Sequence, residues 1–145
     1  LTLSHKERGG VILPLPLWER VRERGMLEGG AFDVFRSRLR QGVDLSRTNW
    51  FRVGGLADWL FKPDNSTDLA AFFAQLPVDC PVTVLGVGSN VIVRDGGIAG
   101  VVIKLGRGFA DIAAEGDMLV AGAAALDVHV AQVAADAGVA GFEFL

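Results

Sequence analysis

The stretch Pro81–Gly97 constrains this chain more than any other, because a short glycine-rich loop separates two apolar runs within it. The runs are Val82–Leu85 and Val91–Val93. Both predict buried strands, since branched side chains pack well on a pleated, covered surface. The loop between them, Gly86–Asn90, is built almost entirely from small residues. The sequence therefore predicts a tight bend between strands, with little side-chain bulk.

The composition of this loop suits an anion. Gly86 and Gly88 can adopt positive φ and leave no Cβ in the way of a ligand. Successive backbone N–H groups in such a turn can form an anion-binding nest, and Ser89 and Asn90 add polar side chains. We interpret the loop as a grip for a diphosphate. A tight hairpin turn without a ligand is an alternative that the loop alone leaves equally open.

Two common phosphate motifs are excluded. The chain has no Gly-x-x-x-x-Gly-Lys-Ser/Thr sequence, so it is not a P-loop nucleotidase. Gly86-Val87-Gly88 lacks the third glycine of a dinucleotide fingerprint, and an apolar run instead of a helical pattern follows it. A Rossmann fold therefore does not fit.

Composition limits the possible partners and cofactors. The chain has 145 residues, half of them hydrophobic, which suits one packed domain. Its net charge is −3 and its basic residues are scattered, so we expect no nucleic-acid partner. Cys80 is a lone cysteine, and His5 and His129 have no matching ligands nearby in the sequence, so we expect no metal site. No apolar run approaches the ~20 residues that span a bilayer, so we expect no membrane partner.

The first part of the chain differs from the rest. Residues 1–25 are rich in basic residues and prolines, and we expect a flexible arm without function, with natural translation starting at Met26. A basic arm that binds a partner is the alternative. Residues 26–46 form a predicted helical lead-in, in which the spacing of Phe32, Phe35 and Leu39 predicts a helix over 31–41 that ends at Gly42.

The remaining pattern is mixed α+β. Strands are predicted at 57–61, 101–105 and 118–121, besides the two that flank the loop. One helix is predicted to begin with Ser66 as N-cap and to end before Pro77. Its expected buried face consists of Leu69, Phe72, Phe73 and Leu76. A second helix is predicted over 126–137 with Gly138 at its C-terminal cap and an inner face of Leu126, Val130, Val133 and Ala137.

Four blocks of the sequence resemble one known family, in the right order and spacing. They are Asn49–Gly55 with Ala57-Asp58, Leu85–Ile103, Val120–Leu126 and Gly138–Leu145. Together they resemble the flavin domain of the UDP-N-acetylenolpyruvoylglucosamine reductases, also called UDP-N-acetylmuramate dehydrogenases. The resemblance covers about residues 47–145.

The resemblance implies an FAD-binding domain of the vanillyl-alcohol-oxidase/PCMH type over residues 47–145. It also implies FAD as cofactor, NADPH as reductant and reduction of the enolpyruvyl group of a UDP-sugar in peptidoglycan synthesis. The expected location is the bacterial cytoplasm. The UDP-sugar would be a partner of the full-length enzyme only.

The family's cofactor contacts can be carried over position by position. The resemblance assigns the flavin diphosphate to the loop and a small-residue segment beside the cofactor to Gly122 and Ala123. Arg52 matches the opening motif and is included as cofactor-binding, although a structural bond to a carbonyl or carboxylate is an alternative. The loop residues concerned are Gly86, Val87, Gly88, Ser89, Asn90 and Val91.

No catalytic residue of the family matches a position in this chain. The family's proton-donating serine and late glutamate belong to a C-terminal substrate domain, which we expect to be absent from a chain truncated at Leu145. Such a chain should have negligible turnover even if flavin still binds, since placed acid–base groups commonly contribute ~10²–10⁴-fold in rate. Uncovered edges would also favour self-association.

Two other functions remain open from the sequence. One is a flavin module of another oxidase or dehydrogenase with the same fold. The other is a nucleotide-binding fragment without catalytic activity.

Overall fold

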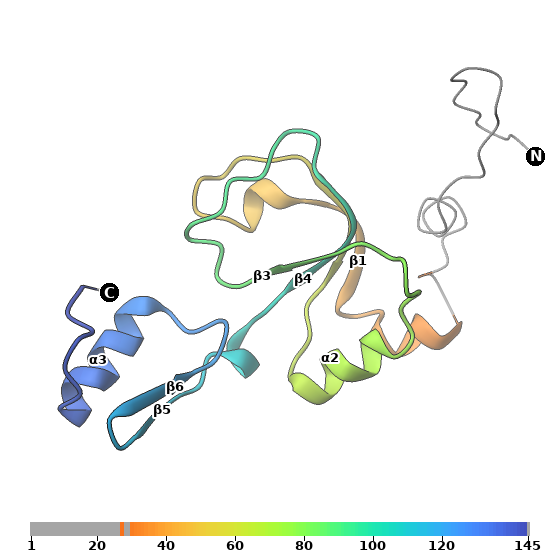
Figure 1. Cartoon of the computed structure of the whole chain (residues 1–145). Coiled ribbons are helices and arrows are strands. Elements are labelled where there is room, and N and C mark those ends of the chain that lie inside the picture. The colour runs from red at the N-terminus through yellow and green to blue at the C-terminus, as the bar shows by residue number, and fades with distance from the viewer. Residues whose placement is uncertain (1–26, 28–29, 145) are drawn as a thin grey trace, which may run out of the picture.

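A four-stranded sheet in the order β1-β2-β4-β3 carries the first part of the fold (Figure 1). The computed structural model describes Leu27 and residues 30–144; the predicted arm, 1–25, lies outside the described residues. The strands of the sheet are β1 (Leu39–Asp44), β2 (Leu56–Phe61), β3 (Val82–Leu85) and β4 (Ile98–Lys104). Helix α2 (Ser66–Phe73) connects β2 to β3. Short 3₁₀ helices η1 (Gly30–Phe35) and η2 (Leu45–Arg47) flank β1.

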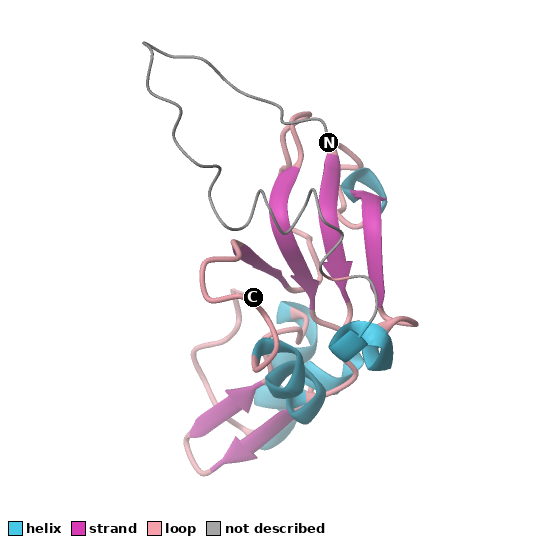
Figure 2. Ribbon diagram, turned by 90° about the vertical axis from the view of Figure 1, so that its right-hand side faces the viewer, coloured by secondary structure: helices cyan, strands magenta, loops and turns pink. Residues whose placement is uncertain are grey.

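A small second unit follows the sheet. After the 3₁₀ turn η3 (Arg107–Phe109), the antiparallel hairpin of β5 (Ile112–Glu115) and β6 (Met118–Ala121) packs against helix α3 (Asp127–Ala137). Figure 2 shows this hairpin and helix beyond one end of the larger sheet. A tight turn at Gly116, with φ 62°, joins β5 to β6.

The direction of the strands determines where the loops gather. β1 is antiparallel to β2, whereas β4 is parallel to both β2 and β3. The carboxyl ends of β2, β3 and β4 therefore lie at one edge of the sheet, at Phe61, Leu85 and Lys104. In open sheets with parallel strands, ligands commonly bind at such an edge.

The core lies on both faces of β4, because Val101, Val102 and Ile103 are fully buried. Side chains alternate along a strand, so Val101 and Ile103 join one cluster and Val102 joins the other. The first cluster is rich in phenylalanine: Phe61 stacks on Phe72 with ring centroids 4.0 Å apart. Phe35 meets both rings edge-on, at 5.4 and 5.3 Å.

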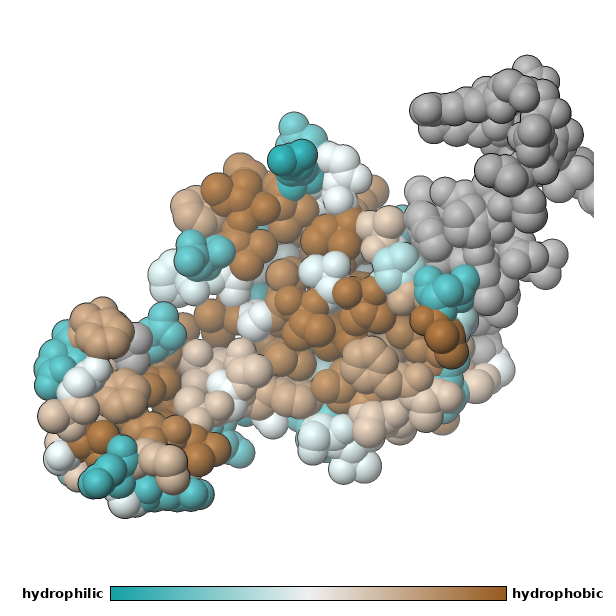
Figure 3. Space-filling model, viewed as in Figure 1, coloured by the Kyte–Doolittle hydropathy of each residue, from teal (hydrophilic) through white to brown (hydrophobic). Residues whose placement is uncertain are grey.

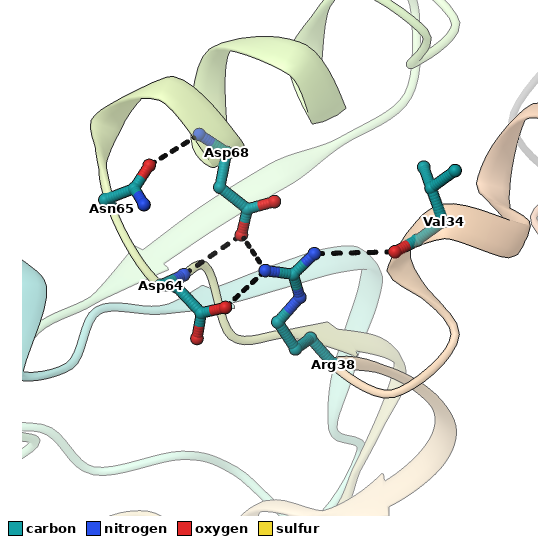
Figure 4. A network of polar contacts seen from close by, with 5 residues as sticks. All are labelled: Val34, Arg38, Asp64, Asn65 and Asp68. Atoms are coloured by element: carbon teal, nitrogen blue, oxygen red, sulfur yellow. Dashed lines mark hydrogen bonds and ion pairs between the residues drawn. The ribbon is translucent and has the colours of Figure 1, made fainter.

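A polar network ties the start of the described chain to helix α2 (Figure 4). The Arg38 guanidinium forms ion pairs with Asp64 and with Asp68, the latter at 3.0 Å, and donates to the carbonyl of Val34 at 3.4 Å. The side chain of Asn65 accepts from the backbone N–H of Asp68 at 2.9 Å. These contacts hold η1, β1 and α2 together around the aromatic cluster.

The predicted helix over 31–41 is wrong beyond Phe35. Phe32 and Phe35 are buried as expected, but they lie on a short 3₁₀ helix. Leu39 begins strand β1 instead, because pairing with β2 satisfies its backbone groups over six residues. Gly42, expected as a helix end, lies within this strand at φ 60°.

The two longer helices are confirmed, with changes at their caps and faces. Asn65, and not Ser66, is the N-cap of α2. In the expected face of α2, Phe73 is 43% exposed while Phe72 is fully buried. In α3 the buried residue is Ala134 rather than the predicted Ala137, and Gly138 takes the left-handed cap conformation as predicted.

Phe72 and Phe73 provide a matched test of this core. We expect Phe72→Ala to lower the free energy of unfolding by about 3–5 kcal/mol, because it removes a ring stacked in the aromatic cluster. Phe73→Ala should cost no more than about 1 kcal/mol. Urea unfolding of the full chain, followed by tryptophan fluorescence, measures both, and equal losses for the two variants would contradict the packing described here.

Candidate functional site

The glycine-rich loop lies at the carboxyl edge of the sheet, in the connection of residues 86–97 from β3 to β4. Since β3 and β4 are parallel neighbours, this connection is a crossover and the hairpin alternative is wrong. The predicted strand Val91–Val93 is also wrong: the segment has no ladder partner, although Val93 is buried. In β3 itself, Leu85 is the buried residue, while Val82 and Val84 are exposed. The loop is therefore held by contacts other than a hairpin ladder.

A side chain is excluded at Gly86 and at Gly88 for different reasons. Gly88 has φ 79°, and a Cβ there would lie 2.7 Å from the carbonyl oxygen of Thr48. Gly86 does not have the positive φ expected from sequence. A Cβ at Gly86 would instead lie 3.0 Å from the carbonyl oxygen of Ala123. The structure thus brings the loop close to two other segments, one near Thr48 and one at Ala123.

The segment near Thr48 is rigidly built. The side chain of Asp44 caps η2 by accepting from the N–H of Ser46 at 2.9 Å, and this bond lowers the pKa of Asp44. The amide group of Asn49 donates to the carbonyls of Leu45 and Val53, both at 2.8 Å. Asn49 is buried, and its Oδ1 has no partner among the described residues. These bonds shape the turn that faces Gly88.

Trp50 and Lys104 join this turn to the loop through hydrogen bonds. The backbone N–H of Trp50 donates to the carbonyl of Gly88 at 3.0 Å. The ammonium of Lys104 donates to the carbonyls of Gly86 at 2.6 Å and Thr48 at 3.0 Å. Figure 1 shows the two chain segments side by side above β3 and β4.

Lys104 is the residue that sequence reasoning missed. It ends β4, where the sequence shows only a charged residue after an apolar run. Its Nζ is half-buried, and burial lowers the pKa of Lys104, with a smaller contribution from the positive charge of Lys62. No sequence motif around Lys104 predicts its contact with Gly86, which lies 18 residues earlier in the chain.

The direction of the loop carbonyls fixes the direction of its amides. In a trans peptide the C=O and the following N–H point in opposite directions, and no cis peptide is present in the described residues. The carbonyl of Gly86 points to Lys104, so the N–H of Val87 points away from it. The carbonyl of Gly88 points to Trp50, so the N–H of Ser89 points away from that residue.

Most backbone N–H groups of the loop have no hydrogen-bond partner among the described residues, although Gly88 itself is buried. Within the described part of the chain, no backbone N–H of residues 86–90 donates a hydrogen bond of good geometry, and residues 89–90 form a turn that brings Val91 back toward Gly88. Several unpaired N–H groups in a glycine-rich turn form a nest with a positive electrostatic potential. A diphosphate fits this arrangement, because it presents acceptor oxygens and no Cβ blocks their approach to the two glycines.

Gly122 and Ala123 are brought to the same place. Gly122 bonds through its N–H to the carbonyl of Asp111 at 2.8 Å, and a Cβ on Gly122 would collide with the carbonyl oxygen of Phe109. The next residue, Ala123, lies beside Gly86, and its carbonyl oxygen forms part of the edge, or rim, of the loop. The structure brings Ala123 close to Gly86, whereas the contact of Gly122 or Ala123 with a cofactor stays a prediction.

Arg52 is adjacent to the loop but does not touch it in the structure. It is exposed, at φ 54°, which is unusual for a residue with a Cβ. It borders a pocket of about 560 Å³ together with Ser46, Arg47, Asn49 and Trp50. The alternative of a structural bond is not what the structure has, since the guanidinium makes no hydrogen bond or ion pair with any described residue. A role toward a cofactor therefore remains a prediction.

Exposed apolar side chains surround this end of the molecule. Figure 3 shows a hydrophobic surface over the loops at the top of the view. The side chain of Trp50 is 69% exposed, and its backbone bonds directly to Gly88. The other large apolar side chains exposed on these two segments are Phe51, Val53, Leu56 and Ile92.

Across Leu27 and residues 30–144, no three His, Cys, Asp or Glu side chains gather in a way that could hold a metal ion. In the same residues, no helix has the length and hydrophobicity needed to cross a membrane.

Curated proteins supply close relatives for this fold and loop. The chain is 60% identical over 110 residues to the UDP-N-acetylenolpyruvoylglucosamine reductase of Gluconobacter oxydans, which covers 76% of the chain. It is 61% identical over 104 residues to that of Jannaschia sp., which covers 72% of the chain. The chain belongs to the UDP-N-acetylenolpyruvoylglucosamine reductase family. No family model matches the chain.

A solved member of the family shares the fold. The crystal structure of UDP-N-acetylenolpyruvylglucosamine reductase (MurB) from Thermus caldophilus matches 72% of the chain with a TM-score of 0.54 and 32% identity. The predicted α+β fold of the vanillyl-alcohol-oxidase/PCMH type is thereby confirmed. The chain spans about a third of its relatives: 36% of the Gluconobacter protein, 34% of the Jannaschia protein and 36% of the solved chain.

Gly88 and Gly96 test how the loop is packed. Gly88→Ala should lower the free energy of unfolding by about 2 kcal/mol or more, because the positive φ and the contact with Thr48 both penalise a side chain. Gly96→Ala should change it by less than about 1 kcal/mol, since a Cβ there meets nothing within 4 Å. Urea unfolding of both variants measures the difference. A Gly88→Ala variant as stable as the Gly96→Ala variant would contradict this geometry.

Proposed function

We propose that this chain binds the diphosphate of FAD and forms the flavin-binding part of a UDP-N-acetylenolpyruvoylglucosamine reductase. The observation that carries the proposal is the set of unpaired amides in the loop of residues 86–90. When bound, FAD would supply the hydride chemistry that a reductase needs. The residues of this chain would hold and orient the cofactor.

Two further features support FAD over a simple phosphate. The rim of the loop includes Ala123 from the second unit, so a ligand on the amides would extend along both parts of the fold. Exposed apolar side chains such as Trp50 and Phe51 offer a surface for a flat ring next to the charged linker. The predicted contacts of Arg52, Gly122 and Ala123 with the cofactor belong to this proposal.

The activity of the whole enzyme is a further proposal. By its family the complete protein would use NADPH to reduce the enolpyruvyl group of a UDP-sugar in peptidoglycan synthesis, in the bacterial cytoplasm. We assign no catalytic residue to the positions present here.

The two alternatives differ in their support. A flavin module of another oxidase or dehydrogenase would use the same loop, but relatives at 54–61% identity carry the reductase name. A nucleotide-binding fragment without flavin preference would require only the amides of the loop. Ligand specificity separates this last alternative from the proposal.

Ligand series test the proposal directly. We expect the full chain to bind FAD at least ~10-fold more tightly than riboflavin, because riboflavin lacks the diphosphate that the amides would hold. FAD should also bind more tightly than ADP, since ADP lacks the ring. Quenching of flavin fluorescence measures the flavins, and displacement of FAD measures ADP.

The variants Gly86→Val and Gly96→Ala serve as test and control in the same titration. Gly86→Val places a branched side chain against Ala123 in the rim and should weaken FAD by ~10-fold or more, while Gly96→Ala should not. Equal affinities for FAD and riboflavin would contradict the diphosphate assignment. Equal affinities for FAD and ADP would favour the nucleotide-binding alternative.

A further inference from the structure

We propose that Lys104 is a positioning residue that orients the amides of the loop toward the cofactor diphosphate, and this inference rests on the proposed function. Its side chain reaches from the end of β4 to two carbonyls, those of Gly86 and Thr48, which belong to different segments. One ammonium therefore joins the loop to the turn that precedes β2. No other charged side chain of the described residues forms a hydrogen bond or ion pair with residues 86–91.

The contact acts on the amides through the geometry of the peptide. As long as Lys104 holds the Gly86 carbonyl on its own side, the N–H of Val87 must face the opposite side. The Trp50–Gly88 bond does the same for the N–H of Ser89. Lys104 also holds the Thr48 carbonyl, two residues before Trp50, so it stabilises the turn that makes this second bond.

Glycine makes such a tether necessary. Gly86 and Gly88 have more accessible backbone conformations than other residues, so a free loop would lose much entropy when it ordered around a ligand. A loop already fixed by Lys104 loses less, which favours binding. No residue larger than glycine fits at position 88: a Cβ there would lie 3.1 Å from the Lys104 Nζ and 2.7 Å from the Thr48 carbonyl oxygen.

The charge of Lys104 acts in the same direction. Its ammonium lies on the carbonyl side of the loop and is partly buried. A positive charge there favours an anion on the opposite side without occupying the space of the ligand. Lys104 is therefore assigned as a positioning residue and not as a direct ligand.

Lys62 offers a matched control for this charge. It lies just beyond the end of β2 and borders the same pocket as Lys104, with a volume of about 410 Å³. Its side chain makes no hydrogen bond or ion pair with the described residues. Removing the charge of Lys62 changes the local potential but leaves the loop contacts intact.

The test compares Lys104→Met, Lys104→Arg and Lys62→Met in the full chain, with two measurements. The first is the dissociation constant of FAD. We expect Lys104→Met to weaken FAD ~10- to 100-fold, because hydrogen bonds to a charged group are lost. Lys104→Arg should recover part of the affinity, and Lys62→Met should stay within ~3-fold of the wild type.

The second measurement needs no cofactor. Amide hydrogen exchange of Trp50 reports its bond to Gly88, and Lys104→Met should speed that exchange ~10-fold or more while exchange in β4 is unchanged. This comparison separates a loosened loop from an unfolded chain. Unchanged Trp50 exchange in Lys104→Met, or an equal loss of FAD affinity in Lys62→Met, would overturn the role of Lys104.

The two proposals fail in different ways. If the wild-type chain binds neither FAD nor ADP, the proposed function is wrong, and with it the purpose assigned to Lys104. If the wild-type chain binds FAD and Lys104→Met binds it equally well, the proposed function stands and the positioning role is wrong.

Discussion

The parallel pairing of β4 with β2 and β3 is the constraint on which the rest of the structure depends. β4 is buried on both faces, so it cannot shift along its neighbours without exposing one cluster or the other. Because three strands run in the same direction, their carboxyl ends share one edge. The glycine-rich loop begins at that edge, and Lys104 ends there too, which explains how they meet from distant parts of the sequence.

Because of this arrangement, the buried apolar residues of β4 determine where the neighbouring polar groups lie. The burial of Val101, Val102 and Ile103 fixes the register of β4 in the sheet. The next residue, Lys104, is thereby placed within hydrogen-bond distance of the loop. Its bonds draw carbonyls to one side and leave amides on the other. The hydrophobic core therefore positions the candidate site through Lys104, and Val91 of the loop packs against the second core cluster.

Much of the fold could be predicted from periodicity, and the failures have physical causes. Helices α2 and α3 follow a pattern that depends on one face being buried, whereas strands β2 and β4 are apolar runs buried on both faces. The predicted helix over 31–41 failed because Leu39 fits a buried strand position as well as a helical one, and pairing with β2 decided between them. The segment Val91–Val93 has the composition of a strand, but it forms no ladder, and Val93 packs into the second core cluster instead.

The candidate site was predictable in part for a related reason. Gly86 and Gly88 identify a loop without bulk, and the resemblance to the reductases adds Gly122 and Ala123, which the fold brings close to Gly86. Lys104 could not be found in this way, because its contacts depend on how three segments meet in space. A glycine motif indicates that another group approaches the backbone closely. The direction in which that backbone faces is decided by whatever holds its carbonyls, and here that is a lysine outside the motif.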